Sequence, residues 1–309
     1  MVQRINRTND YAFKRIMGSE EGKEALIGFL NAVLKPGPGK KLTSVQLLDR
    51  ELDPRYLLDR AARLDILAQT AAGALINIEV QIANQYNIDK RTLYYWAGLY
   101  YGQLSSGENF RRLRKTITIN ILGFGWFAGK NKYHHIFQLR EKDTGELLND
   151  DIEIHFLELP KIMELDRRPS DALEEWMLYL NNLEGKEMEE IAMSNPGIKK
   201  ALTIEQIFQK NKRERRVYEL REKAYRDELS ALAGARAEGE AAGEARGRQE
   251  AICKYLEARF GDASLGLQEK VKQHTEIEKL DKIINKIYTV RSLEEAGAVI
   301  NGTGSAYFD

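Results

Sequence analysis

The chain has 309 residues, 43% of them hydrophobic, which is enough for one large domain with a buried core and an accessory region. Basic and acidic residues balance at 47 each, so any surface that binds nucleic acid must be local. The single cysteine, Cys253, excludes an internal disulfide framework and indicates a reducing compartment. No segment approaches the ~20 apolar residues of a membrane span, and residues 1–7 lack the apolar run of a signal peptide. We therefore expect no membrane association and a cytoplasmic location.

The chain begins with two predicted helices. Thr8 or Asn9 can cap a short helix through Met17, which Gly18 ends. A second helix carries one apolar stripe, formed by Ala25, Leu26, Phe29, Leu30, Val33 and Leu34. The sequence Lys-Pro-Gly-Pro-Gly at residues 35–39 stops it. A first strand is predicted at residues 45–48.

Two apolar segments, residues 63–67 and 76–82, predict a β-hairpin with its turn around Gly73. The second segment alternates strictly between apolar side chains (Ile76, Ile78, Val80 and Ile82) and polar ones (Asn77, Glu79 and Gln81). Successive side chains of a strand point to opposite faces, so the alternation predicts a strand that is apolar on one face only.

The polar side of this hairpin collects acidic residues. Asp65 lies between two apolar neighbours on the first segment, and Glu79 and Gln81 lie on the polar face of the second. We expect these three side chains to meet on one side of a half-buried sheet. Burying carboxylates is costly unless something compensates, and a divalent cation is the usual compensation. Without a cation, ion pairs with Arg63 or Arg91 are the alternative.

A helix is predicted from about residue 88 to 104, followed by strands at 116–122, 133–139 and 152–157. The resulting order, two helices, three strands, a helix and three strands, predicts an α/β sandwich around a mixed central sheet flanked by helices. Basic residues precede the strand at 116–122, namely Arg111, Arg112, Arg114 and Lys115. This run suits contacts with nucleic-acid phosphates, and a solvated surface is the alternative.

From Asp171 onward the pattern is helical, including one helix from Ile198 into the 220s. The Ala/Gly-rich stretch 231–247 contains Gly234, Gly239, Gly243 and Gly247, and glycine costs about 1 kcal/mol per helical position. Either another backbone approaches closely there, or the stretch is a flexible hinge. We expect a core at residues 1–165, a helical extension at 166–230, an Ala/Gly-rich helix or linker at 231–250 and a small helical domain at 251–309.

The ordered motifs resemble a known family. Asp65, followed fourteen residues later by Glu-x-Gln on the adjacent strand, resembles the catalytic core of the PD-(D/E)XK nucleases. More narrowly, it resembles the recombination-promoting nuclease (Rpn) branch, also called PD-(D/E)XK nuclease family transposases. Residues 10–18 and 30–34 look like the N-terminal signature of that branch, and residues 154–161 look like its final core strand. The similarity covers about residues 5–220, and the C-terminal unit resembles a helical domain of unassigned role often appended to such nucleases.

The resemblance implies a restriction-endonuclease-like α/β core followed by an all-helical C-terminal region. It implies a metal-dependent DNA endonuclease linked to recombination, mobile elements or defence. Asp65 and Glu79 would be the metal ligands and Gln81 the third catalytic residue, with Mg²⁺ as the expected ion and Mn²⁺ as the alternative. We also expect a homo-oligomer, as a dimer, because cutting both DNA strands requires two sites.

Gln81 stands where the broader superfamily usually has lysine, a substitution that is usual in the Rpn branch. An amide can orient a water but supplies no charge, so a cation must come from elsewhere. Lys14, Arg63 and Arg91 are the candidates, and Asp10 is a candidate further carboxylate. Two rival functions stay open: a nuclease acting on RNA, and an inactive module that binds DNA or protein.

Overall fold

The computed structural model describes residues 4–49, 64–84, 86–129, 132–165 and 167–302. The chain divides into two compact units, residues 1–224 and 225–309, and each is described by itself. Within the described residues, no helix combines the length and the apolar character needed to cross a membrane.

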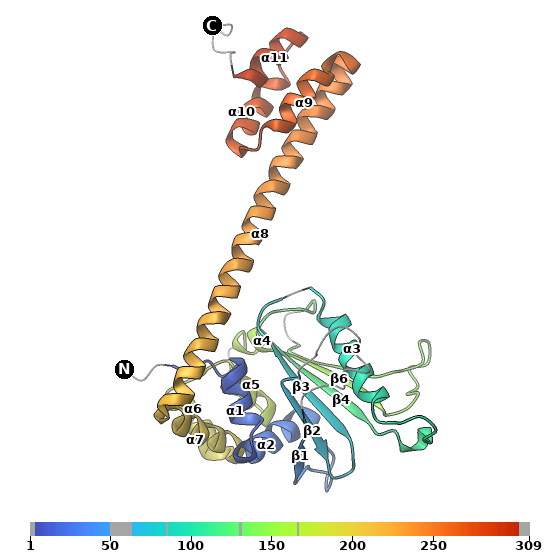
Figure 1. Cartoon of the computed structure of the whole chain (residues 1–309), viewed down its shortest axis with the longest axis vertical. Helices are drawn as coiled ribbons and strands as arrows, with labels where there is room; N and C mark the ends of the chain where they lie inside the picture. The colour runs from blue at the N-terminus through green and yellow to red at the C-terminus, as the bar shows by residue number, and fades with distance from the viewer. Residues whose placement is uncertain (1–3, 50–63, 85, 130–131, 166, 303–309) are drawn as a thin grey trace. The chain divides into compact units, whose positions relative to one another are not determined.

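The first unit is built on a mixed six-stranded sheet, which confirms the predicted fold class (Figure 1). The strands are β1 (Val45–Leu47), β2 (Ile66–Thr70), β3 (Leu75–Gln81), β4 (Thr116–Leu122), β5 (His134–Phe137) and β6 (Ile152–Glu158). Their order in the sheet is β1-β2-β3-β4-β6-β5. β4 is parallel to both β3 and β6, and the remaining neighbours pair antiparallel.

The helices of this unit are α1 (Asp10–Met17), α2 (Lys23–Leu34), α3 (Ile88–Tyr101), α4 (Leu159–Met163), α5 (Ala172–Leu180), α6 (Lys186–Ser194) and α7 (Pro196–Lys210). Side-chain caps fix several of their starts. The Asn9 side chain accepts hydrogen bonds from two amides of α1, and Asp171 accepts one from the Glu174 amide of α5. α3 connects the parallel strands β3 and β4, as a crossover helix should.

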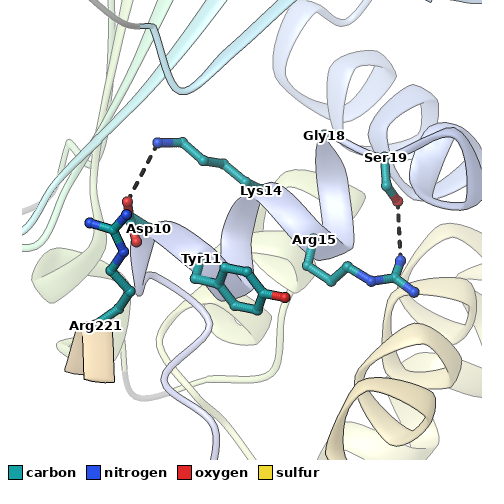
Figure 2. Close-up of a pocket in the computed structure, with 7 residues that line it drawn as sticks. All are labelled: Asp10, Tyr11, Lys14, Arg15, Gly18, Ser19 and Arg221. Atoms are coloured by element: carbon teal, nitrogen blue, oxygen red, sulfur yellow. Dashed lines mark hydrogen bonds and ion pairs between the residues drawn. The ribbon is translucent and has the colours of Figure 1, made fainter. Parts of the chain in front are cut away.

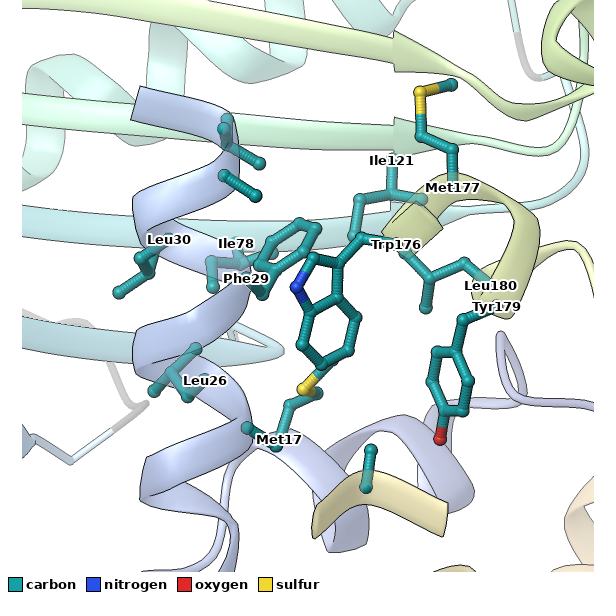
Figure 3. Packing of buried hydrophobic residues seen from close by; sticks show 14 of the residues in the cluster. Met17, Leu26, Phe29, Leu30, Ile78, Ile121, Trp176, Met177, Tyr179 and Leu180 are labelled. Carbon is teal, nitrogen blue, oxygen red and sulfur yellow. The ribbon is translucent and has the colours of Figure 1, made fainter. Parts of the chain in front are cut away.

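The main core lies between the apolar face of the sheet and the helices around α2 and α5 (Figure 3). Trp176 is fully buried in it, with its ring edge-on to Phe29 at 5.8 Å between centroids. Next to this indole, α2 and α7 approach each other at Gly28 and Gly197. A Cβ on Gly197 would lie 3.0 Å from the Trp176 ring and 3.3 Å from the Gly28 Cα, so any larger residue would force these neighbours to move.

The predicted helix from Ile198 into the 220s is two helices. α7 ends at Lys210, and the Asn211 side chain accepts hydrogen bonds from the Arg213 and Glu214 amides to begin α8 (Lys212–Phe260). Asn211 itself has an extended backbone, which interrupts the helical hydrogen bonds.

The second unit contains the rest of α8, the helices α9 (Leu265–Gln273), α10 (Ile277–Ile287) and α11 (Leu293–Asn301), and a core of its own. The Ala/Gly-rich stretch is part of α8. Among the described residues, no atom of a neighbouring element lies within 4 Å of a Cβ placed on Gly234, Gly239, Gly243 or Gly247.

Candidate active site

Asp65 and Glu79 lie opposite each other at the end of the β2–β3 hairpin that is remote from its turn. The register pairs Ile66 with Ile78, which places Asp65 across from Glu79. The Asp65 amide donates to Glu79 Oε1 at 3.3 Å, and Asp65 Oδ2 accepts from the Val80 amide at 2.9 Å. Each carboxylate is therefore fixed by the backbone of the other strand.

Two cations neutralise this carboxylate pair. The Lys14 ammonium, from α1, lies 2.8 Å from Asp65 Oδ1 and 3.6 Å from Asp10 Oδ2. The Arg91 guanidinium, from α3, lies 3.3 Å from Glu79 Oε2. The structure thus brings together Asp10, Lys14, Asp65, Glu79 and Arg91 of the residues proposed from the sequence, whereas Arg63 lies outside the described residues.

The Glu79 carboxylate is in an unusual electrostatic environment. Its side chain is only 5% exposed. Burial, followed by the charge of Asp65, raises the pKa of Glu79 to about 7, against the opposing effect of Arg91. The raised pKa of Glu79 means that burial and the neighbouring Asp65 together outweigh the stabilising charge of Arg91.

Gln81 follows on the same face of β3, two residues after Glu79. Its Nε2 donates to the Ala83 carbonyl at 3.3 Å. Its Oε1 is buried and accepts no hydrogen bond from the described residues. Buried acceptors are normally satisfied, so this oxygen marks a place for a water or a ligand.

The polar face continues from β3 to β4, where Asn120 pairs in register with Glu79. The Thr92 hydroxyl of α3 donates to Asn120 Oδ1 at 3.0 Å, and Asn120 Nδ2 donates to the His155 carbonyl at 3.1 Å. Neither Asn120 nor Thr92 was predicted from the sequence. The signal for Asn120 was the polar alternation of Thr116, Thr118 and Asn120 within an otherwise apolar strand, and this pattern says nothing of Thr92 on α3.

The basic run proposed to contact nucleic acid lies elsewhere. It precedes Thr116, which pairs with Leu75, four residues before Glu79 on β3, or about 13 Å along a strand. The Lys115 ammonium forms ion pairs with Asp150 and Glu153, each at 2.8 Å. Arg112 pairs with Glu108 of its own segment, and the Arg114 side chain packs on Gly73 at the hairpin turn. Arg111, in the short helix η3 (Phe110–Arg112), belongs to the same run. The structure does not bring these residues to Asp65.

The donor set fits a hard divalent cation. Among the described residues, no cluster of three or more histidine, cysteine or acidic side chains is suited to hold a metal. The site instead offers two opposed carboxylates and the unpartnered Gln81 oxygen, and Mg²⁺ commonly takes one or two carboxylates and keeps several waters. Lys14 and Arg91 are the groups with which such a cation would compete, and both are long side chains with 21% and 33% exposure.

A mixed sheet with helices on both sides, carrying opposed carboxylates and a glutamine on its central hairpin, places the protein in the PD-(D/E)XK class of nucleases. The family model described as PD-(D/E)XK nuclease family transposase matches residues 7–235, and the chain belongs to that family. PD-(D/E)XK nucleases generally use divalent metals. No curated protein and no solved structure matches the chain.

Proposed function

We propose that the protein is a metal-dependent endonuclease that hydrolyses phosphodiester bonds of DNA, in the setting of recombination, mobile elements or defence. One observation carries the proposal: two carboxylates from neighbouring strands are held against each other, and the pKa of the buried Glu79 is raised to about 7. A cation held by Asp65 and Glu79 would relieve their repulsion.

Asp65 and Glu79 would hold the ion, with Mg²⁺ expected and Mn²⁺ as the alternative. A bound cation polarises the phosphate and lowers the pKa of a water. Lys14 and Arg91 each contact one oxygen of these carboxylates, and a bound metal would compete with them there. The two cations would remain next to the site, where they could stabilise the negative charge that builds up on the phosphate.

The Gln81 amide would orient the attacking water. Its Oε1 is buried and without a hydrogen-bond partner among the described residues, so it can accept a hydrogen from that water. An amide contributes no charge, which leaves the stabilisation of negative charge to Lys14 and Arg91.

The direct test incubates purified protein with supercoiled plasmid and Mg²⁺, beside Asp65→Asn and Glu79→Gln variants. Asp89→Asn is the matched control, because Asp89 is an exposed acid in the first turn of α3. We expect wild type and the control to nick or linearise the plasmid and the two site variants not to. Cleavage that survives both site changes would reject the site.

Two further outcomes identify the rival functions. Cleavage of RNA without cleavage of DNA, again lost in Asp65→Asn, would make the protein a ribonuclease. Retained binding without cleavage of either nucleic acid would make it a binding module in which Lys14 and Arg91 permanently neutralise the carboxylates.

We also propose that the active form is a homodimer, because cutting both strands of DNA requires two sites. The four glycines of α8 weaken the helix, and within the described chain no neighbouring element packs against them. Close packing of α8 against a second copy would explain why glycine occurs there. Sedimentation at micromolar concentration tests it, and a monomer would count against it.

A further inference from the structure

A cavity of about 470 Å³ lies beside α1 in the first unit. Figure 2 shows the residues that line it: Asp10, Tyr11, Lys14, Arg15, Gly18, Ser19 and Arg221. Six of the seven come from α1 and the turn after it, and Arg221 comes from the start of α8, which belongs to the same unit. The family motif residues of β3 contribute nothing to its lining.

Three of the lining side chains are cationic and one is acidic. Arg15 is held in place by Glu21 at 2.8 Å and Glu214 at 3.1 Å, and it donates to the Ser19 hydroxyl at 3.4 Å. Arg221 is exposed, and among the described residues no ion pair to it occurs. Figure 2 shows its guanidinium reaching toward the N-terminal end of α1, where Asp10 lies. Three cationic groups from two separate elements thus line the cavity, and Arg221 is the one that carries no ion pair among the described residues, whereas Lys14 and Arg15 are paired with carboxylates.

Lys14 connects this cavity to the candidate active site. Its ammonium lies 2.8 Å from Asp65 Oδ1, while its side chain forms part of the cavity wall. A group bound in the cavity consequently lies one side chain away from the carboxylate pair. Guanidinium and ammonium groups on a concave surface favour phosphate oxygens, which accept several charge-assisted hydrogen bonds at once.

We propose that Lys14, Arg15 and Arg221 form a subsite for a backbone phosphate of the nucleic-acid strand, next to the phosphodiester bond that is cleaved. The proposal rests on the proposed nuclease function. In this proposal Arg221, at the start of α8, contacts the substrate. Helix α1 then lies between the carboxylate pair and the bound nucleic-acid strand.

The test measures the affinity of a fluorescein-labelled oligonucleotide, duplex or single-stranded, by anisotropy in EDTA, so that no cleavage occurs. The salt concentration is varied from 50 to 200 mM. Arg221→Ala should weaken binding by about three- to tenfold and lower the slope of log K against log salt by roughly 0.7 to 0.9, the contribution of one phosphate contact. Arg221→Lys, which keeps the charge, should keep the slope.

Lys223→Ala is the matched control, because Lys223 is an exposed cation on the same helix that does not line the cavity. It should leave affinity and slope unchanged. Equal effects of Arg221→Ala and Lys223→Ala would overturn the subsite, as would failure of the wild-type protein to bind the oligonucleotide at 50 mM salt.

The outcome for the subsite is separable from that for the nuclease. Plasmid cleavage together with equal effects of the two variants would remove the subsite and leave the proposed function intact. Absence of cleavage, together with a selective loss of affinity in Arg221→Ala, would support the phosphate subsite and reject the proposed nuclease activity.

Discussion

In metal-free protein, the stability of the first unit should depend on the protonation of Glu79. The pKa of this buried carboxyl is raised from its ordinary value of 4.5 to about 7, first by burial and then by Asp65. The folded state therefore binds a proton more tightly than the unfolded state. The stability contributed by protonated Glu79 is fully present below pH 4.5 and is lost as the pH rises through 7.

The size of the effect follows from the same values. Each pH unit between 4.5 and 7 lowers the free energy of unfolding by about 1.4 kcal/mol, so that up to about 3 kcal/mol is lost by neutral pH. In Glu79→Gln this loss is absent, because the amide does not titrate. Arg91 loses its partner in the variant, which changes the stability at every pH alike and adds no slope.

Urea denaturation in EDTA at pH 4.5 to 8 measures the difference directly. The free energy of unfolding of wild type minus that of Glu79→Gln should fall by up to about 3 kcal/mol across this range. The same difference between wild type and Asp89→Asn should not change with pH. Parallel pH profiles for wild type and Glu79→Gln would refute the reasoning, since they would mean that Glu79 does not titrate with a raised pKa.

Three other parts of the structure can be tested by substitution. Gly197→Ala should destabilise by about 1–3 kcal/mol in urea denaturation, because its Cβ meets the buried Trp176 ring at 3.0 Å, whereas Gly266→Ala, in open space, should not. Hydrogen bonds from Arg167 lower the pKa of Glu174 to about 2, so wild type should lose stability as the pH falls from 4.5 to 2, and Glu174→Gln should lose less. Gln81→Ala should slow plasmid cleavage about 10²-fold, whereas Gln81→Lys should still cleave the plasmid. If Gln81→Ala cleaved as fast as wild type, Gln81 would have no part in the mechanism.

The strands of the sheet were predictable because apolar residues in the sequence recur with the period of a strand. The alternation in β3 matches its two faces, but the expectation of a half-buried sheet is wrong there, because the polar face with Asn77, Glu79 and Gln81 is buried as well. The strong strand predicted at 116–122 is β4. Strand ends were less predictable. The first hairpin strand was expected at residues 63–67, but β2 begins at Ile66 and extends to Thr70. The Asp65 carboxylate accepts a hydrogen bond from the Val80 amide, so at this end of the hairpin a side chain replaces a backbone hydrogen bond between the strands.

The candidate site was predictable only in part. Hairpin register alone brings Asp65 and Glu79 face to face, so local sequence suffices for that pair. The Lys14–Asp65 contact depends instead on how α1 packs beside the hairpin, some fifty residues away in sequence. Arg221 is more distant still, and nothing in its sequence context distinguishes it from other charged residues of α8. Which cations reach the site depends on tertiary packing, and tertiary packing cannot be read from local residue patterns.

We propose that Asp65 and Glu79 share one divalent cation. Mn²⁺ titrated into wild type, Asp65→Asn and Glu79→Gln, with the electron paramagnetic resonance signal of the free ion recorded, measures that binding. Wild type should show one tight site per chain, weakened about tenfold or more by either substitution. Undiminished Mn²⁺ binding in both variants, or no binding by the wild-type chain, would contradict it.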